Sequence, residues 1–150
     1  MEIKTGFQDG GEIPEKYTCD GENLSPEITI EDIPEDTISL VLIFHDPDAP
    51  MPGGFTHWLL WNIPKTREIQ QGVVPKGAIE GLNSGGEPGY TGPCPPSGVH
   101  HYELSIFALN TTLDLDEDSD KTQLEDAMQG SVLAEARISG IYASKQKGRI

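Results

Sequence analysis

The polar residues with the clearest chemical potential stand at the ends of apolar segments. Asp46 and Asp48 follow one such segment, His57 begins the next, and His100 and Tyr102 begin a third. Imidazole N–H groups, a phenol O–H and backbone amides are donors that can bind a phosphate-like anion. A carboxylate beside a histidine orients the ring and favours its protonated form, and Asp46 is our candidate for that role. The residue types therefore predict an anion pocket, whose carboxylates could also accept from the ammonium group of a zwitterion such as phosphoethanolamine.

A stiff loop of glycines and prolines precedes the third segment. It runs from Gly92 to Gly98, and its prolines fix φ and remove backbone donors. The segment that follows has the pattern of a strand, in which side chains alternate between two faces. We therefore expect His100 and Tyr102 to share one face, with His101 on the opposite face.

Short apolar segments bounded by prolines and glycines indicate that strands dominate the chain. Residues 38–44 form a nearly continuous apolar run, which is typical of a strand buried on both faces. Antiparallel neighbours would place the end of one strand beside the start of the next, so the polar residues at these ends could converge. We expect further strands over residues 56–63, 100–109 and 132–139, and shorter strands over residues 2–7 and 27–30.

One helix is expected late in the chain. It begins near Asp120, because Gln123 stands three positions later as in a capping box. Leu124, Ala127 and Met128 then fall on one face. Many short strands with a single clear helix predict a mainly β fold, an antiparallel β sandwich with one or two peripheral helices.

The size and charge of the chain exclude several classes of protein. Its 150 residues suit one domain over residues 1–150 with a substantial core. Twenty-five acidic and ten basic side chains give a formal net charge of −15, whose field repels nucleic acid and anionic membranes. The first residues lack the pattern of a leader peptide, and no apolar run approaches the roughly 20 residues that span a bilayer. We therefore expect a cytoplasmic protein without nucleic-acid partners or membrane insertion.

Several of the same residues have a purely structural interpretation. Asp46 and Asp48 flank a proline and could form an Asx turn. Cys19 and Cys94 are too few for a disulfide framework and lack the spacing of a zinc site, although they could still meet in space. Cys94 lies between prolines with no basic residue nearby, so an inert thiol is favoured over a nucleophile.

Three classes of function are compatible with these residues. A non-enzymatic protein that binds phosphate or a phosphorylated head group is favoured, because donors and a carboxylate are present without an evident activated nucleophile. The alternative is a hydrolase, with either a metal held by His57, His100 and Asp46 or a thiol mechanism using Cys94 with His100. The third is a regulatory protein with a vestigial pocket. If protonated imidazoles supply the charge, anion binding should weaken as pH rises above their pKa.

These motifs, in this order, resemble the phosphatidylethanolamine-binding protein family, including the Raf kinase inhibitor-like proteins, and more closely its bacterial and archaeal branch. The similarity covers nearly the whole chain. Its strong elements are the segments 46–50 (DPDAP), 57–58 (HW), 89–96 (GYTGPCPP) and 100–102 (HHY). Weaker support comes from the segments 19–26, 61–64 and 140–142.

The resemblance implies two antiparallel sheets with Greek-key connections, a few peripheral helices and one small anion pocket without a metal or cofactor. Members bind phosphate-like groups, and some animal and plant relatives act through protein partners such as kinases. A monomer or homodimer is expected. His101 departs from the family pattern, which commonly has arginine there, and the segment 83–88 is also atypical. The ligand-binding residues carried over by position are Asp46, Asp48, His57, Gly92, Pro93, His100 and Tyr102.

Overall fold

Two antiparallel sheets dominate the computed structural model, which describes residues 1–145. One sheet has the order β1-β2-β5, with β1 at Glu2–Thr5, β2 at Ile28–Glu31 and β5 at Glu68–Ile69. The other has the order β6-β4-β3-β7-β8, with β6 at Ile79–Glu80, β4 at Phe55–Pro64, β3 at Ser39–Asp46, β7 at Val99–Leu109 and β8 at Val132–Ala143. A 3-10 turn, η1, spans Glu15–Tyr17, and the helix α1 spans Lys121–Met128.

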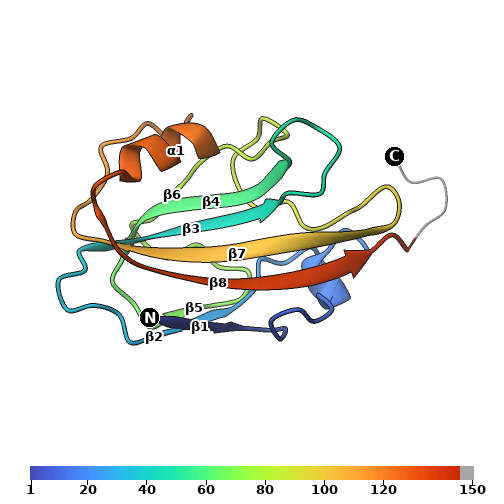
Figure 1. Ribbon diagram of the computed structural model, residues 1–150, viewed down its shortest axis with the longest axis horizontal. Coiled ribbons are helices and arrows are strands. Elements are labelled where there is room, and N and C mark those ends of the chain that lie inside the picture. Colours follow the sequence, from blue (N-terminus) through green and yellow to red (C-terminus); the bar gives the residue numbers. More distant parts are fainter. Residues whose placement is uncertain (146–150) are drawn as a thin grey trace.

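Strand β3 is buried on both faces, as its apolar run predicts. Leu40, Leu42 and Phe44 point into the larger core, which lies between the two sheets. Val41 and Ile43 point into a smaller core beneath α1. Figure 1 shows this layering, with α1 on one side of the five-stranded sheet and the three-stranded sheet on the other. Each fully buried side chain of this kind stabilises the fold by about 1.5–3 kcal/mol, so β3 anchors both layers.

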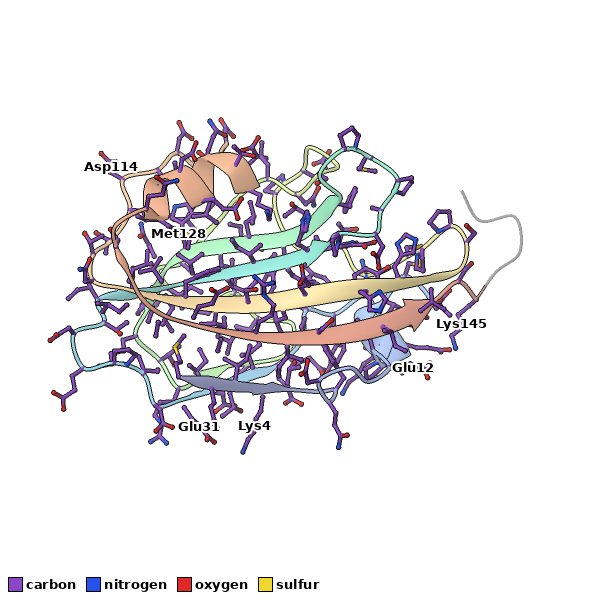
Figure 2. The ribbon with its side chains drawn as sticks, in the orientation of Figure 1. Lys4, Glu12, Glu31, Asp114, Met128 and Lys145 are labelled. Carbon is purple, nitrogen blue, oxygen red and sulfur yellow. A yellow bond between two sulfur atoms is a disulfide. The ribbon has the colours of Figure 1, made fainter. Side chains whose placement is uncertain are left out.

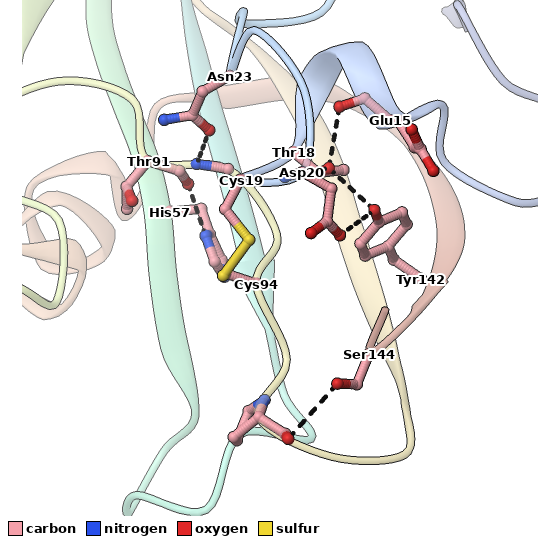
Figure 3. The surroundings of a disulfide bond; sticks show 12 residues. Glu15, Thr18, Cys19, Asp20, Asn23, His57, Thr91, Cys94, Tyr142 and Ser144 are labelled. Carbon is pink, nitrogen blue, oxygen red and sulfur yellow. Dashed lines mark hydrogen bonds between the residues drawn. A yellow bond between two sulfur atoms is a disulfide. The ribbon is translucent and has the colours of Figure 1, made fainter. Parts of the chain in front are cut away.

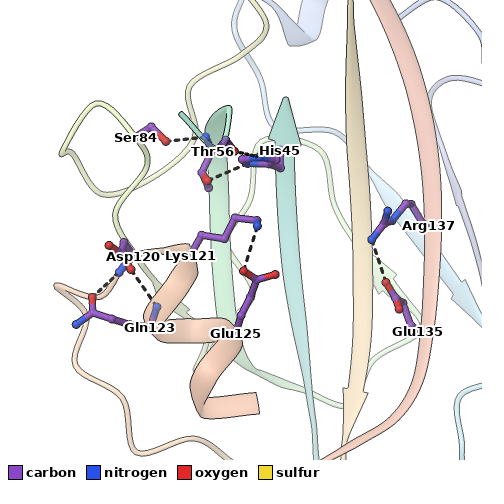
Figure 4. A network of polar contacts seen from close by, with 10 residues as sticks. His45, Thr56, Ser84, Asp120, Lys121, Gln123, Glu125, Glu135 and Arg137 are labelled. Carbon is purple, nitrogen blue, oxygen red and sulfur yellow. Dashed lines mark hydrogen bonds and ion pairs between the residues drawn. The ribbon is translucent and has the colours of Figure 1, made fainter. Parts of the chain in front are cut away.

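Helix α1 begins with the capping box that the sequence predicts. The Asp120 carboxylate accepts from the Gln123 amide at 3.0 Å, and the Gln123 side chain accepts from the Asp120 amide at 2.9 Å (Figure 4). Leu124 and Met128 are buried against the five-stranded sheet. The cap and the buried face together explain why this segment is helical.

The six expected strands are all present in the described residues, and the antiparallel sandwich with one helix is confirmed. Strand β8 continues to Ala143, beyond the predicted residue 139, because it pairs with β7 along its whole length. The short strands β5 and β6 and the turn η1 were not expected; two-residue strands carry almost no periodic signal. The Greek-key connections stay a prediction.

Ion pairs lie mostly on the outside of this fold. Lys4 of β1 and Glu31 of β2 pair at 3.5 Å on the outer side of the three-stranded sheet (Figure 2). Such exposed pairs contribute about 1 kcal/mol or less, so the two cores carry the stability. Within residues 1–145, no helix is both long enough and apolar enough to cross a membrane.

Candidate functional site

Strand pairing brings the predicted polar residues together at one end of the five-stranded sheet. Strand β3 pairs antiparallel with both β4 and β7. Its last residue, Asp46, therefore lies opposite Phe55 at the start of β4 and near the start of β7. The expected convergence of strand ends is observed: Asp46, His57, His100 and Tyr102 line one cavity.

A β-bulge aims His57 into this cavity. Phe44 of β3 pairs with Trp58 of β4, and the next residue of β3, His45, pairs with Thr56. His57, between Thr56 and Trp58, has no partner on β3 and is the extra residue of the bulge. A bulge of this kind breaks the alternation of side chains and re-aims one of them. The His57 ring consequently lies on the same side as Phe44 and Tyr102, with ring centroids 5.8 Å and 5.3 Å away.

Asp46 and His100 form a buried hydrogen-bonded pair. His100 donates from Nδ1 to Asp46 Oδ2 at 2.6 Å, and their side chains are 12% and 3% exposed. The other carboxylate oxygen accepts from the Asp48 amide at 2.7 Å, which is the Asx turn that the sequence suggested. Asp46 therefore has both roles: it shapes the turn and it orients the imidazole. The contact leaves Nε2 of His100 for a ligand.

His57 has a different electrostatic character from His100. Its Nδ1 donates to the Thr91 carbonyl oxygen at 2.6 Å (Figure 3). Burial lowers the pKa of His57 to about 4, against smaller opposing effects of the Thr91 hydrogen bond and the Asp46 carboxylate. At neutral pH this ring is uncharged, so the expectation that protonated imidazoles supply the charge does not hold for His57.

Tyr102 lies between the two histidines and completes the polar wall. Its ring stacks against His100 at 6.3 Å between centroids and meets the edge of His57 at 5.3 Å. The residue is almost wholly buried, whereas the intervening His101 is exposed. The predicted alternation along β7 is confirmed.

The loop that precedes β7 is tied to the segment after η1. Gly92 donates its amide to Asn23 Oδ1 at 2.9 Å (Figure 3). The Pro93 carbonyl accepts from the Cys19 amide at 3.2 Å. A side chain at Gly92 would collide with the Tyr17 carbonyl and with Asn23. The Gly92 amide is thus not a ligand donor, and the glycine serves the close approach of two backbones.

Cys19 and Cys94 form a disulfide across 75 residues of chain. The sequence had left this pairing open, and the expectation of an inert free thiol at Cys94 is wrong. A thiol mechanism using Cys94 has no thiol available in this state. Cys94 instead lines the cavity and fastens the loop that forms one wall (Figure 3).

The cavity enclosed by these elements measures about 290 Å³. Asp46, His57, His100 and Tyr102 supply its ionisable groups, and much of the remaining lining is apolar. Most of the additional lining residues lie within the recognised segments 46–50 and 89–96, and only Met51 and Phe55 lie outside them. The additional lining residues are Ala49, Pro50, Met51, Phe55, Thr91, Cys94, Pro95 and Pro96.

Two predicted site residues lie outside the cavity lining. Pro93 is not among the lining residues, and its carbonyl faces Cys19. Asp48 accepts from both the amide and Nδ1 of His101 at 2.7 Å each. These hydrogen bonds lower the pKa of Asp48. Asp48 therefore joins the loop after β3 to the start of β7.

His45, which the sequence did not single out, braces the same loop from the other face of the sheet. Its Nε2 donates to the Gly53 carbonyl at 2.8 Å, which leaves Nδ1 to accept from the Thr56 hydroxyl at 3.0 Å (Figure 4). Burial lowers the pKa of His45. Both ring nitrogens are engaged, so His45 has a structural role in holding residues 47–54.

The metal-ligand set proposed for a hydrolase is not assembled. Residues 1–145 contain no group of three or more histidine, cysteine, aspartate or glutamate side chains arranged to hold a metal ion. The arrangement is instead that of a small polar site between aromatic and proline walls.

The family model described as phosphatidylethanolamine-binding protein matches residues 3–143. The chain belongs to the phosphatidylethanolamine-binding protein family. The predicted resemblance is therefore confirmed over nearly the whole chain.

Relatives and solved structures of this family agree with the fold. A UPF0098 protein of Methanothermobacter thermautotrophicus is 45% identical, with 95% of this chain and 98% of the relative covered. The crystal structure of a phosphatidylethanolamine-binding protein homologue from Chlamydia trachomatis superposes with a TM-score of 0.91 at 36% identity, covering 96% and 97% of the two chains. Escherichia coli YbcL, described as a member of the mammalian family, superposes with a TM-score of 0.90 at 29% identity, covering 96% and 98%.

Proposed function

We propose that this phosphatidylethanolamine-binding protein family member is a non-enzymatic binding protein whose cavity holds phosphate or a phosphorylated head group such as phosphoethanolamine. The observation that carries the proposal is the buried Asp46–His100 pair at the cavity wall. The Asp46 carboxylate, 2.6 Å from Nδ1, fixes the orientation of the imidazole, whose Nε2–H can donate to an anion when the ring is protonated.

The charge of the whole molecule makes a local site necessary. With a net charge of −15, the long-range field repels anions, so an anion needs short, charge-assisted hydrogen bonds inside a sheltered cavity. The cavity of about 290 Å³ is at the small end for a ligand site and suits a head group. Its walls of proline, methionine and phenylalanine are apolar, and a low local dielectric strengthens each polar contact.

Binding is favoured over catalysis because the described site offers no activated nucleophile. Cys94 is in a disulfide, and the two cavity histidines hold their Nδ1 protons against acceptors that fix ring orientation. Activated nucleophiles require a nucleophile and a base within hydrogen-bonding reach. These contacts suit a fixed recognition site.

Calorimetric titration with inorganic phosphate and with phosphoethanolamine tests the proposal. We expect saturable binding that His100→Ala weakens at least about tenfold, since a charge-assisted hydrogen bond contributes about 1.5–3 kcal/mol. His101→Ala is the matched control: it is the next residue and also contacts a carboxylate, but it lies outside the cavity. Absence of binding by the native protein, or equal weakening by both variants, would refute the proposal.

We propose that a protein partner, such as a kinase, binds this protein and distinguishes the ligand-bound form from the ligand-free form. Met51 lines the cavity and is 42% exposed, so an apolar side chain at the cavity is accessible to a partner. Exposed apolar side chains at a ligand site are typical of interaction surfaces. We propose a monomer or homodimer, which sedimentation would distinguish.

The cytoplasm is the proposed location, and the disulfide supplies its test. Disulfides persist mainly in oxidising compartments and are rare in the reducing cytosol. Alkylation of free thiols during cell lysis should therefore show whether Cys19 and Cys94 are reduced in the cell. Complete oxidation in the native host would contradict a reducing cytoplasmic location.

A further inference from the structure

The hydrogen bond between His57 and Thr91 fixes where the imidazole carries its proton. The Thr91 carbonyl oxygen is an acceptor only, and it lies 2.6 Å from Nδ1. The proton must therefore be on Nδ1. In a neutral imidazole the other nitrogen is then an acceptor, so His57 Nε2 presents a lone pair rather than an N–H.

The surroundings of His57 keep that lone pair free of a proton. The rings of Phe44, Phe55 and Tyr102 pack around the imidazole, and His57 is only 6% exposed. Among charged and titratable groups, Asp46 favours protonation while His45 and His100 oppose it, and burial outweighs all of them in lowering the pKa to about 4. No residue within 1–145 hydrogen-bonds to Nε2, and His57 lines the cavity.

The two cavity histidines therefore offer complementary groups. His100 is oriented by a carboxylate and, when protonated, donates from Nε2. His57 is oriented by a carbonyl and accepts at Nε2. An oxyanion without a proton would meet the His57 lone pair with a lone pair of its own, and it would leave a buried acceptor unsatisfied.

We propose that the cavity selects an oxyanion that carries its own acidic proton, namely inorganic phosphate or a protonated phosphomonoester, and discriminates against sulfate and phosphodiesters. One acidic P–OH donates to His57 Nε2 while an anionic oxygen accepts from His100. This selectivity rests on the proposed anion-binding function and adds the protonation state of the ligand. No bond is made or broken in this recognition.

Competition among three small anions tests the selectivity on the native protein. Phosphate, sulfate and dimethyl phosphate are titrated calorimetrically at matched ionic strength near pH 6.5, where phosphate carries at least one proton and the other two carry none. Sulfate matches the size of phosphate, and dimethyl phosphate matches the charge of its monoanion. We expect phosphate to bind at least about tenfold more tightly than either, since an unmet buried acceptor costs about 1–3 kcal/mol.

The outcomes separate this inference from the function on which it rests. If none of the three anions binds, the proposed function itself fails. If sulfate or dimethyl phosphate binds as tightly as phosphate, anion binding stands and the selectivity is refuted. Preference for phosphate supports both.

A variant and a spectroscopic measurement test the role of His57 itself. His57→Gln offers an amide that can turn either its oxygen or its N–H group toward a ligand, so the ratio of phosphate to sulfate affinity should fall toward one. Nitrogen-15 NMR of the native protein should show His57 protonated at Nδ1 and bare at Nε2 throughout the neutral range. A proton on Nε2 would overturn the inference even if the variant failed to fold.

Discussion

His100 donates its Nδ1 proton to the carboxylate of Asp46, 54 residues earlier in the chain, over 2.6 Å. The contact joins the end of β3 to the start of β7, so the pairing of these two strands creates the polar wall of the cavity. The same aspartate closes the turn at Asp48. The proposed anion site is therefore formed by the central strands of the sheet.

Replacement of Asp46 should distinguish the effect of its charge on ligand binding from the effect of its size. Asp46→Asn keeps the size of the side chain but replaces the charged acceptor of the His100 Nδ1 proton with a neutral amide, so phosphate affinity should fall about tenfold. Asp48→Asn is the matched control, because the Asp48 carboxylate accepts from the exposed His101 and lies outside the cavity lining. Calorimetry on the two variants measures the difference, and unchanged affinity in Asp46→Asn would contradict the role of the pair.

The buried His57 should make the protein less stable in mild acid. Its folded pKa of about 4 lies below the usual value of 6.5, so between these pH values the unfolded chain binds more protons than the folded chain. The contribution is fully present above pH 6.5 and is lost as pH falls through about 4, to a total of about 3 kcal/mol. Urea unfolding across this range measures it.

His57→Gln is the control for that pH dependence, because glutamine does not titrate. The free energy of unfolding of the variant should depend less steeply on pH between about 6.5 and 4, while the pH dependence caused by carboxylates at lower pH remains. Identical slopes in the two proteins would show that His57 is not buried in its neutral form.

Loss of the disulfide should loosen the cavity wall as well as destabilise the fold. Cys19→Ser with Cys94→Ser releases a cross-link that closes a long loop, which should cost about 2–4 kcal/mol in the free energy of unfolding. Phosphate binding should weaken too, since Cys94 lines the cavity. A reductant should reproduce both effects in the native protein and have none on the double variant; any other pattern argues against the disulfide as the cause.

Gly92 should tolerate no side chain. A methyl group there meets the Tyr17 carbonyl and Asn23, so Gly92→Ala should destabilise the fold by more than about 2 kcal/mol through strain and the lost amide contact. Gly98→Ala is the comparison: it has open space, but its φ of +68° costs about 1 kcal/mol in alanine. Thermal unfolding ranks the two, and the reverse order would be inconsistent with the close approach at Gly92.

Much of the fold could be read from local patterns. The apolar run of β3 and the Asp120–Gln123 cap are short-range signals, and both correspond to observed elements. The alternation along β7 likewise placed His100 and His101 on opposite faces. These features depend on residues close together in the chain, which is why the sequence predicts them.

Features set by distant contacts could not be predicted in this way. The bulge at His57 depends on register with β3, and the proton on its Nδ1 depends on a carbonyl 34 residues away. The pairing of Cys19 with Cys94 spans 75 residues. Asp48 shares its motif with Asp46, yet its carboxylate accepts from His101, because β3 ends at Asp46 and the chain enters the Asx turn there.

A nitrogen-15 NMR titration of the native protein with inorganic phosphate tests the central claim most directly. The chain has four histidines, so those outside the cavity serve as internal controls for those that line it. We predict saturable shifts of the His57 and His100 imidazoles with a shared midpoint, while His45, with both nitrogens engaged, and the exposed His101 change little. Unmoved His57 and His100 resonances at high phosphate, or equal shifts at all four histidines, would contradict an anion site between β3, β4 and β7.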